Sequence, residues 1–246
     1  SLSIIGEFRS AWVKTRIALL LLALLVEVLL LRLGFWQLAR GEQKQLQIEA
    51  LQSVLRDKSP VDLAVSNSDA EGYTWVNGRV RILPEPLLLL DNQRKGAVVG
   101  VNVYQIGVAN DGMAMLIDLG WLPVAGNRAL PKPEALSGTF LLSGLLLPPP
   151  SMGFRMGPSM SEQADGSWLL MRMDRDALAE RLSRPLAARV LRVDPALKIG
   201  FSRDLQVQAN TLPPGKHRGY ALQWFGLAAA WLMLCIYVSR RKKNER

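Results

Sequence analysis

The sequence predicts a membrane protein in which two transmembrane helices flank an external α+β domain, built on an antiparallel sheet or a partly closed β-barrel. Three observations support this fold class. An apolar run, IALLLLALLVEVLLLRL, covers residues 17–33, and a second run covers residues 220–238. Each is close to the ~20 apolar residues that a helix needs to cross a bilayer. Between the runs, short apolar stretches are separated by Gly, Pro, Asn and Asp, as in a β-rich domain.

The first transmembrane helix is expected over residues 17–38, because GFWQL extends the first apolar run. A leucine-rich run after a basic start is also typical of a cleaved signal peptide. No small-x-small cleavage site follows this one, and its exit, LGFWQLAR, is bulky. We therefore expect a retained anchor. The next residues, EQKQLQIEALQSVL, have helical spacing and predict that the helix continues away from the membrane.

The distribution of charge predicts the topology. The chain has 30 basic and 21 acidic residues, a net charge of +9, and basic residues crowd into the tails 1–16 and 239–246. Both tails adjoin apolar segments, which indicates membrane orientation and no nucleic-acid partner. The positive-inside rule puts both tails in the cytoplasm, with the second span at 217–238 and residues 39–216 outside. The outside is the periplasm for a bacterial inner membrane, or the intermembrane space for a mitochondrial inner membrane.

The external segment is long enough for one domain. Five strands are predicted, with sequences TWVNGRVRIL, PLLLLDNQ, GVNVYQIGVA, MAMLIDLGWLPV and TFLLSGLLL. The turn Asn110–Gly112 predicts a hairpin, and DRDALAERL predicts a short helix capped by Asp174. A last pair of strands is expected in ARVLRVD and RDLQVQAN.

The motifs of common enzyme classes are missing from the sequence. It contains no P-loop, no G-x-G-x-x-G and no G-x-S-x-G motif. The chain has one cysteine, Cys235, and one histidine, His217, which exclude an intrachain disulfide and a zinc site of Cys/His type. A Ser-His-Asp triad in the external domain is not expected either. We therefore expect a protein without catalytic residues.

Two features leave alternatives open. Glu27 lies about ten residues into the first span. Placing a carboxyl group there costs several kcal/mol of free energy unless the group is paired, protonated or in contact with water. It either contacts a partner helix or cofactor, or stays neutral and hydrogen-bonds the second span. Met152, Met156 and Met160 lie in PPPSMGFRMGPSM. Their thioethers either bind Cu(I), or the segment is an apolar loop that touches a partner or the membrane.

Residues at the outer membrane face form the candidate binding site. Trp36 leaves the first span and Trp224 enters the second, so both are expected at one depth. They form either an aromatic belt or one side of a slot for a planar ligand. His217 is either an axial ligand for haem iron or a polar residue at the interface.

Two stretches, LGFWQLARGEQK at residues 33–44 and HRGYALQWFGLA at residues 217–228, together resemble the Surfeit locus protein family, whose members are assembly factors for cytochrome c oxidase. The pattern L-G-x-W-Q-x-x-R-x-x-x-K is matched by Leu33, Gly34, Trp36, Gln37, Arg40 and Lys44. The pattern H-x-x-Y-A-x-Q-W-F is matched by His217, Tyr220, Ala221, Gln223, Trp224 and Phe225. GWLP at 120–123 is similar to the family element R-G-W-x-P, with Leu119 in place of the arginine.

The resemblance implies a protein that assists haem a binding and its insertion into oxidase subunit I, alongside other assembly factors. His217 would bond to the haem iron. The residues expected to bind the cofactor are His217, Tyr220, Trp224, Trp36, Gln37 and Arg40. Gly34 and Gly226 would let the helices or a porphyrin come close, and Arg40, Lys44 or Arg218 would face haem propionates or lipid phosphates. The alternatives are a scaffold that binds no haem and a copper-handling protein.

Overall fold

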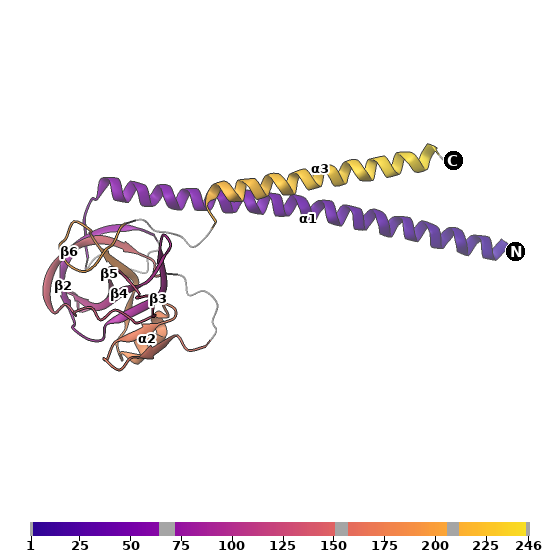
Figure 1. The fold of residues 1–246 in the computed structure, drawn as a ribbon. Coiled ribbons are helices and arrows are strands. Elements are labelled where there is room, and N and C mark those ends of the chain that lie inside the picture. Colours follow the sequence, from indigo (N-terminus) through magenta and orange to yellow (C-terminus); the bar gives the residue numbers. More distant parts are fainter. Residues whose placement is uncertain (1, 64–71, 151–156, 206–211, 245–246) are drawn as a thin grey trace. The chain divides into compact units, whose positions relative to one another are not determined.

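The fold comes from a computed structural model, which divides into two compact units (Figure 1). The helix pair comprises Ser1–Ile48 and Gln208–Arg246, and the β-domain comprises Glu49–Val207. Each unit is described by itself. The described residues are 2–63, 72–150, 157–205 and 212–244.

The helix pair is formed by α1 (Leu2–Asp57) and α3 (Pro214–Asn244). Ala23 contacts Trp231, and Gln37 contacts His217. Later residues of α1 therefore contact earlier residues of α3, which means that the two helices are antiparallel. Both helices are long and apolar enough to cross a membrane, judged by length and composition, over Lys14–Asp57 and Pro214–Arg241. Only 6% and 11% of their most apolar windows are buried. The transmembrane segments expected from the sequence fall inside these two helices.

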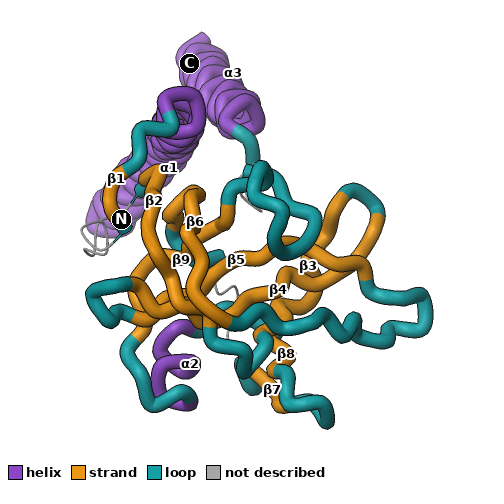
Figure 2. The backbone as a smooth tube through the Cα atoms, turned by 90° about the vertical axis from the view of Figure 1, so that its left-hand side faces the viewer, coloured by secondary structure: helices purple, strands orange, loops and turns teal. Residues whose placement is uncertain are grey.

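Among the residues that the structure describes, the β-domain carries one nine-stranded sheet and one short helix, and Figure 2 shows their arrangement. The chain order is β1 (Val61–Asp62), β2 (Thr74–Ile82), β3 (Leu88–Lys95), β4 (Val98–Ala109), β5 (Ala114–Pro123), β6 (Gly138–Leu147), β7 (Met160–Glu162), β8 (Trp168–Leu170), α2 (Arg175–Arg181) and β9 (Leu186–Val193). The strand order is β1-β2-β6-β9-β5-β4-β3-β8-β7, and β2 also pairs with β4. Five strands therefore pair in a circuit, β2-β6-β9-β5-β4 and back to β2.

The sheet is mixed, whereas the sequence predicted an antiparallel one. Three pairs are parallel, namely β1–β2, β3–β8 and β5–β9. The physical reason is the connectivity of the chain, which reaches β9 through α2. β9 inserts between β5 and β6, and it runs parallel to β5 and antiparallel to β6. Long-range pairings of this kind leave no local signal in the sequence.

Local predictions in the β-domain are confirmed with one exception. Gly112 adopts a φ of +82° in the β4–β5 hairpin, and the Asp111 carboxylate accepts from the Met113 N–H at 2.9 Å. Asp174 caps α2 by accepting from the Ala177 N–H at 3.2 Å. The strand expected in RDLQVQAN is wrong for its described part, since residues 203–205 are not in a strand; residues 206–210 lie outside the described residues.

The last turns of α1 belong to the β-domain and confirm that the helix extends beyond the apolar run. Leu51 packs with Trp75, Leu145 and Leu147 in one hydrophobic cluster. Lys58, at a φ of 41°, follows the helix and places its ammonium 4.6 Å from the Trp75 ring centroid. Burial of these apolar side chains therefore holds the last turns of α1 against the strands of the β-domain, the unit to which these turns belong.

Candidate functional site

His217 lies in the first turn of α3 and is half-buried. Its Nδ1 is 2.7 Å from the Gln37 amide oxygen of α1. An amide oxygen only accepts, so a hydrogen bond at this contact requires a proton on Nδ1. The lone pair of the imidazole is then on Nε2, which is the atom that can bind a metal ion. The structure thus brings together two of the predicted site residues.

The packing of α1 beside His217 depends on glycine. A Cβ on Gly41 would lie 3.4 Å from the His217 Cβ and 3.5 Å from the Pro214 carbonyl oxygen. A Cβ on Gly34 would lie 2.5 Å from the Phe225 ring, closer than real atoms approach. Gly34, Gln37 and Gly41 are separated by three and four positions and share one face of α1. This face receives the start of α3 at short range.

The corresponding face of α3 has the same spacing. Ala221 and Ala228 are 1% and 2% exposed, and Trp231 donates its indole N–H to the Ala23 carbonyl at 3.1 Å. We use the name seam for the two facing stripes, which consist of Ala23, Glu27, Gly34, Gln37 and Gly41 on α1 and His217, Ala221, Phe225, Ala228 and Trp231 on α3. The three-and-four spacing is the signal by which the sequence could have identified Gly41 and Trp231.

The close approach between the helices that was expected at two glycines is found at one of them. Gly34 does provide a close approach between the helices, as expected. Gly226 does not, because a Cβ added there would meet nothing within 4 Å. The reason is helical geometry: Gly226 is one residue past Phe225, which turns it about 100° away from the seam.

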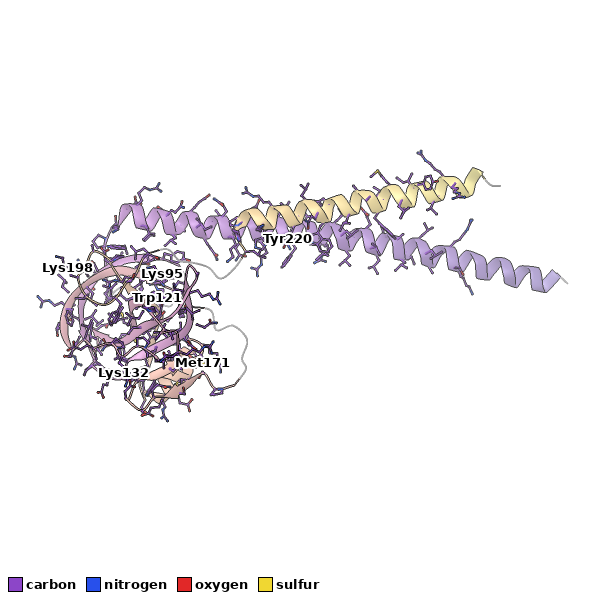
Figure 3. The ribbon with its side chains drawn as sticks, in the orientation of Figure 1. Lys95, Trp121, Lys132, Met171, Lys198 and Tyr220 are labelled. Carbon is purple, nitrogen blue, oxygen red and sulfur yellow. The ribbon has the colours of Figure 1, made fainter. Side chains whose placement is uncertain are left out.

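The predicted aromatic residues have different surroundings. Trp36 is 52% exposed and Tyr220 is 41% exposed, whereas Trp224 is half-buried. Figure 3 labels Tyr220 near the start of α3. Trp36 directly follows Phe35, whose ring makes an edge-on contact with Phe225 at 5.2 Å between centroids. The sequence did not predict this aromatic contact between the helices, whereas Trp36 presents its ring to the surroundings.

Cationic side chains surround the His217 end of the seam. Lys216 and Arg218 flank His217 on α3, and both are exposed. Arg40 is exposed on α1 and donates to the Gln43 amide oxygen at 3.0 Å. The Arg218 Cγ would be 3.9 Å from a Cβ on Gly41, so its stem lies against α1. This end of the seam is suited to an anionic group.

The donor set at this end fits a haem. Neutral imidazole with its lone pair at Nε2 is a haem-iron ligand, and the nearby cations suit two carboxylates. The exposed rings of Trp36 and Tyr220 offer flat apolar surface close by along the chain. Among the described residues, no group of three or more His, Cys, Asp or Glu side chains could hold a metal ion. His217 is therefore the residue on which iron binding would depend.

Glu27 lies deeper in the seam, one heptad before Gly34. Its Oε2 is buried and has no hydrogen-bond partner among the residues that the structure describes. A hydrogen bond from this oxygen to the second helix, one of the two sequence-based alternatives, is thus not formed. An unsatisfied carboxyl oxygen in an apolar helix pair costs free energy unless a proton or an external group satisfies it.

Of the three methionines singled out in the sequence, Met160 alone is among the described residues. Met152 and Met156 lie outside the described residues. Met160 begins β7 and packs, half-buried, against the hydrophobic cluster that contains Leu170 and Leu178. Its role in packing is that of an ordinary apolar side chain.

The GWLP motif at residues 120–123 has a structural role in the β-domain. Gly120 has a φ of +115°, and a Cβ there would lie 2.8 Å from the Phe201 carbonyl oxygen. The Trp121 N–H donates to the Ser202 carbonyl at 2.8 Å, so residues 201–202 lie along β5. Leu119, where the family pattern has arginine, is 1% exposed in the core. The glycine is needed for this close backbone approach.

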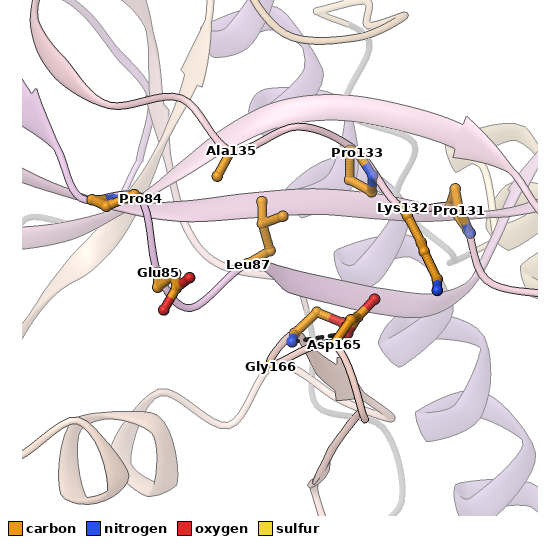
Figure 4. Close-up of a pocket in the computed structure, with 10 residues that line it drawn as sticks. Pro84, Glu85, Leu87, Pro131, Lys132, Pro133, Ala135, Asp165 and Gly166 are labelled. Carbon is orange, nitrogen blue, oxygen red and sulfur yellow. Dashed lines mark hydrogen bonds between the residues drawn. The ribbon is translucent and has the colours of Figure 1, made fainter.

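The β-domain also has a surface hollow of about 250 Å³ (Figure 4). Proline rings and the side chains of Glu85, Lys132 and Asp165 line it. Hydrogen bonds from the Ser167 hydroxyl and backbone N–H lower the pKa of Asp165 below its ordinary value. This carboxylate is already occupied by its own loop, and none of the predicted site residues lines the hollow.

Comparison with known protein families matches residues 24–229 to the SURF1 family. The matched region begins within α1, contains the whole β-domain and ends within α3. No curated protein matches the sequence. The family is associated with oxidase assembly, in agreement with the resemblance carried by the two sequence motifs.

Proposed function

The chain belongs to the SURF1 family, and we propose that it is a membrane-bound assembly factor that holds haem a and passes it to cytochrome c oxidase subunit I. One observation carries the haem part of this proposal. The only histidine of the chain is hydrogen-bonded through Nδ1 to Gln37, which leaves the Nε2 lone pair for a metal ion. The cations around it suit haem propionates.

The membrane part of the proposal is supported by what the two helices expose. Leucine and other large apolar side chains are exposed on α1 from Ile17 to Leu38 and on α3 from Tyr220 to Val238. In water such surfaces would associate or aggregate, whereas lipid solvates them. We propose a multi-pass protein of the bacterial inner membrane, or of the mitochondrial inner membrane in a eukaryote. Both basic tails are then cytoplasmic, or in the mitochondrial matrix, and the β-domain lies outside.

Each site residue has a defined task in this proposal. His217 ligates iron through Nε2, Gln37 orients the imidazole, and Arg40, Lys216 and Arg218 attract the propionates. Trp36, Tyr220 and Trp224 supply apolar surface at the level of the lipid head groups. Haem a supplies the redox-active centre that the oxidase subunit requires. A single protein ligand suits transfer, because the chain must release what it binds, and no catalytic step on a substrate is needed.

The experiment is to purify the full chain from cells that make haem a and to record its reduced spectrum. We expect a haem a band in the wild type and its loss in His217→Ala. Gln223→Ala is the matched control, because Gln223 is polar and exposed on the same helix. A wild type without a haem a band would reject the haem proposal. A band that persists in His217→Ala would reject the ligand.

A scaffold that binds no haem is the second candidate, and the observation that favours it is Glu27. A carboxyl oxygen without a hydrogen-bond partner among the described residues, inside an apolar helix pair, suits contact with a polar group on an oxidase helix. This candidate predicts that Glu27→Leu weakens co-purification of oxidase subunit I, while His217→Ala leaves it unchanged. The opposite pattern favours the haem carrier. A copper-handling role is less well supported, because Met160 is engaged in packing.

A further inference from the structure

Gln37 and His217 form a hydrogen bond between side chains that joins α1 to α3, at 2.7 Å. A histidine ring has two neutral tautomers, and a hydrogen bond to one nitrogen decides which nitrogen keeps its proton. The Gln37 amide oxygen accepts and does not donate, so the bond favours a proton on Nδ1. The opposite tautomer would place two lone pairs against each other at this distance.

We propose that Gln37 is a positioning residue that fixes His217 in the Nδ1–H tautomer and so presents Nε2 as the ligating atom. The part that concerns iron rests on the proposed haem function, whereas the tautomer is a property of the chain alone. In metal sites, such a partner on the second ring nitrogen orients the imidazole and makes it a stronger ligand.

The backbone around the pair makes Gln37 suited to this task. Gly41 is one turn after Gln37, and its missing Cβ lets α1 approach the His217 Cβ and the Pro214 carbonyl. The histidine is thus held at its base by packing on Gly41 and at its ring by Gln37. Gln37 and Gly41 lie on one face of α1. A helix is a rigid element, and it holds a ligand in position more precisely than a loop does.

The hydrogen bond also has an electronic consequence. An acceptor at Nδ1–H increases the basicity of Nε2, which favours the more positively charged oxidised iron. Gln37→Met removes the acceptor and keeps the approximate side-chain length, so it should raise the reduction potential of bound haem. Gln37→Glu keeps the shape and provides a stronger, charged acceptor, so it should lower the potential.

The first experiment needs no haem. Because the chain has one histidine, labelling histidine with ¹⁵N gives a single imidazole whose two nitrogens can be read by NMR. In the full chain in micelles, at about pH 8 where a free imidazole is neutral, we expect a protonated Nδ1. Gln37→Met should shift the ring toward the Nε2–H tautomer. Gln47→Met, the same change at an exposed position of α1, should not. An Nε2–H ring in the wild type would overturn the proposal.

The second experiment uses the chain loaded with haem a. Loss of such a partner typically weakens metal affinity about 10- to 100-fold, and we expect a change in that range for Gln37→Met. The reduction potentials of haem bound to Gln37→Met and to Gln37→Glu should move in opposite directions. A merely structural role of Gln37 would move both potentials the same way, and that result would overturn the proposed electronic effect on Nε2. If the wild type binds no haem a but its tautomer depends on Gln37, the haem function fails and the positioning of His217 stands.

Discussion

The two units of this protein bury their side chains in opposite ways. In the β-domain, aliphatic residues such as Val76, Val80 and Leu145 are fully buried. In the helix pair, Leu20 is 66% exposed and Leu222 is 73% exposed, and burial is concentrated in the seam. The β-domain is therefore stabilised by the hydrophobic effect in water. Among its described residues the helix pair has no comparable core, so its two helices depend on close packing and a few polar contacts.

The units also treat charge differently. In the β-domain, Asp118 is 2% exposed, but it contacts the Arg192 guanidinium at 2.9 Å and accepts from the Gly120 N–H. Burial lowers the pKa of Arg192, but the attraction of Asp118 outweighs it and the net pKa is raised. In the helix pair, Glu27 keeps an oxygen without a hydrogen-bond partner among the described residues. The β-domain satisfies the Asp118 charge internally, whereas the helix pair buries the Glu27 oxygen without such a partner.

The largest expected effect tests the internal pairing of the β-domain. Asp118→Ala removes the carboxylate that contacts the Arg192 guanidinium at 2.9 Å, at a site where the arginine is 15% exposed. Breaking a buried pair in this way costs about 3–5 kcal/mol. We expect this loss in the free energy of unfolding, measured by urea titration of the β-domain tryptophan fluorescence in the full chain.

Two variants control this experiment. Asp176→Ala removes an ion pair with Arg175 whose carboxylate is 89% exposed, and it should change the stability little. Asp118→Leu combined with Arg192→Leu should recover much of the loss, because both charges of the pair are replaced by apolar side chains. A loss in Asp118→Ala no larger than in Asp176→Ala would contradict the role of the pair.

The next effect tests the packing of the helix pair. Gly34→Ile places branched atoms where even a Cβ would lie 2.5 Å from the Phe225 ring. Overpacking of this kind costs about 1–3 kcal/mol, and we expect the two helices to separate more easily. SDS-driven separation in mixed micelles, followed by energy transfer between dyes on α1 and α3, measures this change. Gly226→Ile is the matched control, since nothing lies within 4 Å of its Cβ; equal effects would contradict the seam.

These two glycines also show what the sequence could predict. Both belong to the stretches that carry the family resemblance, and both were expected to let the helices or a porphyrin come close. Gly34 has the three-and-four spacing with Gln37 and Gly41 on α1, whereas Gly226 is out of step with Ala221, Phe225 and Ala228 on α3. The helices, the hairpin at Gly112 and the cap at Asp174 were predictable, because each depends on neighbouring residues. The family was predictable from the two motifs that flank the membrane spans.

The remaining features depend on contacts between distant residues. The insertion of β9 between β5 and β6 joins strands far apart in sequence, which no local pattern encodes. The Gln37–His217 hydrogen bond connects side chains 180 positions apart. Gln37 was expected to contact the cofactor, yet its amide is occupied by His217. The sequence identified the residue, and only the structure indicates its partner.

A smaller effect tests the deep end of the seam. Trp231→Phe keeps an aromatic ring and removes the N–H that donates to the Ala23 carbonyl. Hydrogen bonds between membrane helices contribute about 0.6 kcal/mol on average, so we expect a small decrease in the same mixed-micelle measurement. Trp36→Phe, at an exposed position on α1, is the control and should have no effect. A decrease of the same size in Trp36→Phe would indicate that general ring packing, not this bond, holds the helices.

The smallest effect returns to the β-domain. The Tyr104 hydroxyl is buried, and in the described part of the chain no group meets the distance and angle of a hydrogen bond to it; the Asn102 side chain is close enough to lower its pKa against the effect of burial. Burial, reinforced by the Asp118 carboxylate, raises the pKa of Tyr104 above its ordinary value. The folded state therefore keeps this proton when the unfolded chain, with a tyrosine pKa of about 10, has released it. Stability from this group is complete below about pH 10 and falls as the pH rises above it.

Tyr104→Phe separates these two consequences. At about pH 8 the variant should be as stable as the wild type or up to about 1 kcal/mol more stable, because it removes an unsatisfied hydroxyl. At about pH 10.5 the wild type should have lost more of its stability than the variant. Urea titrations at the two pH values measure both differences. If the variant is clearly destabilised at about pH 8, the hydroxyl has a partner after all, and the β-domain satisfies its polar groups even more completely than Asp118 and Arg192 indicate.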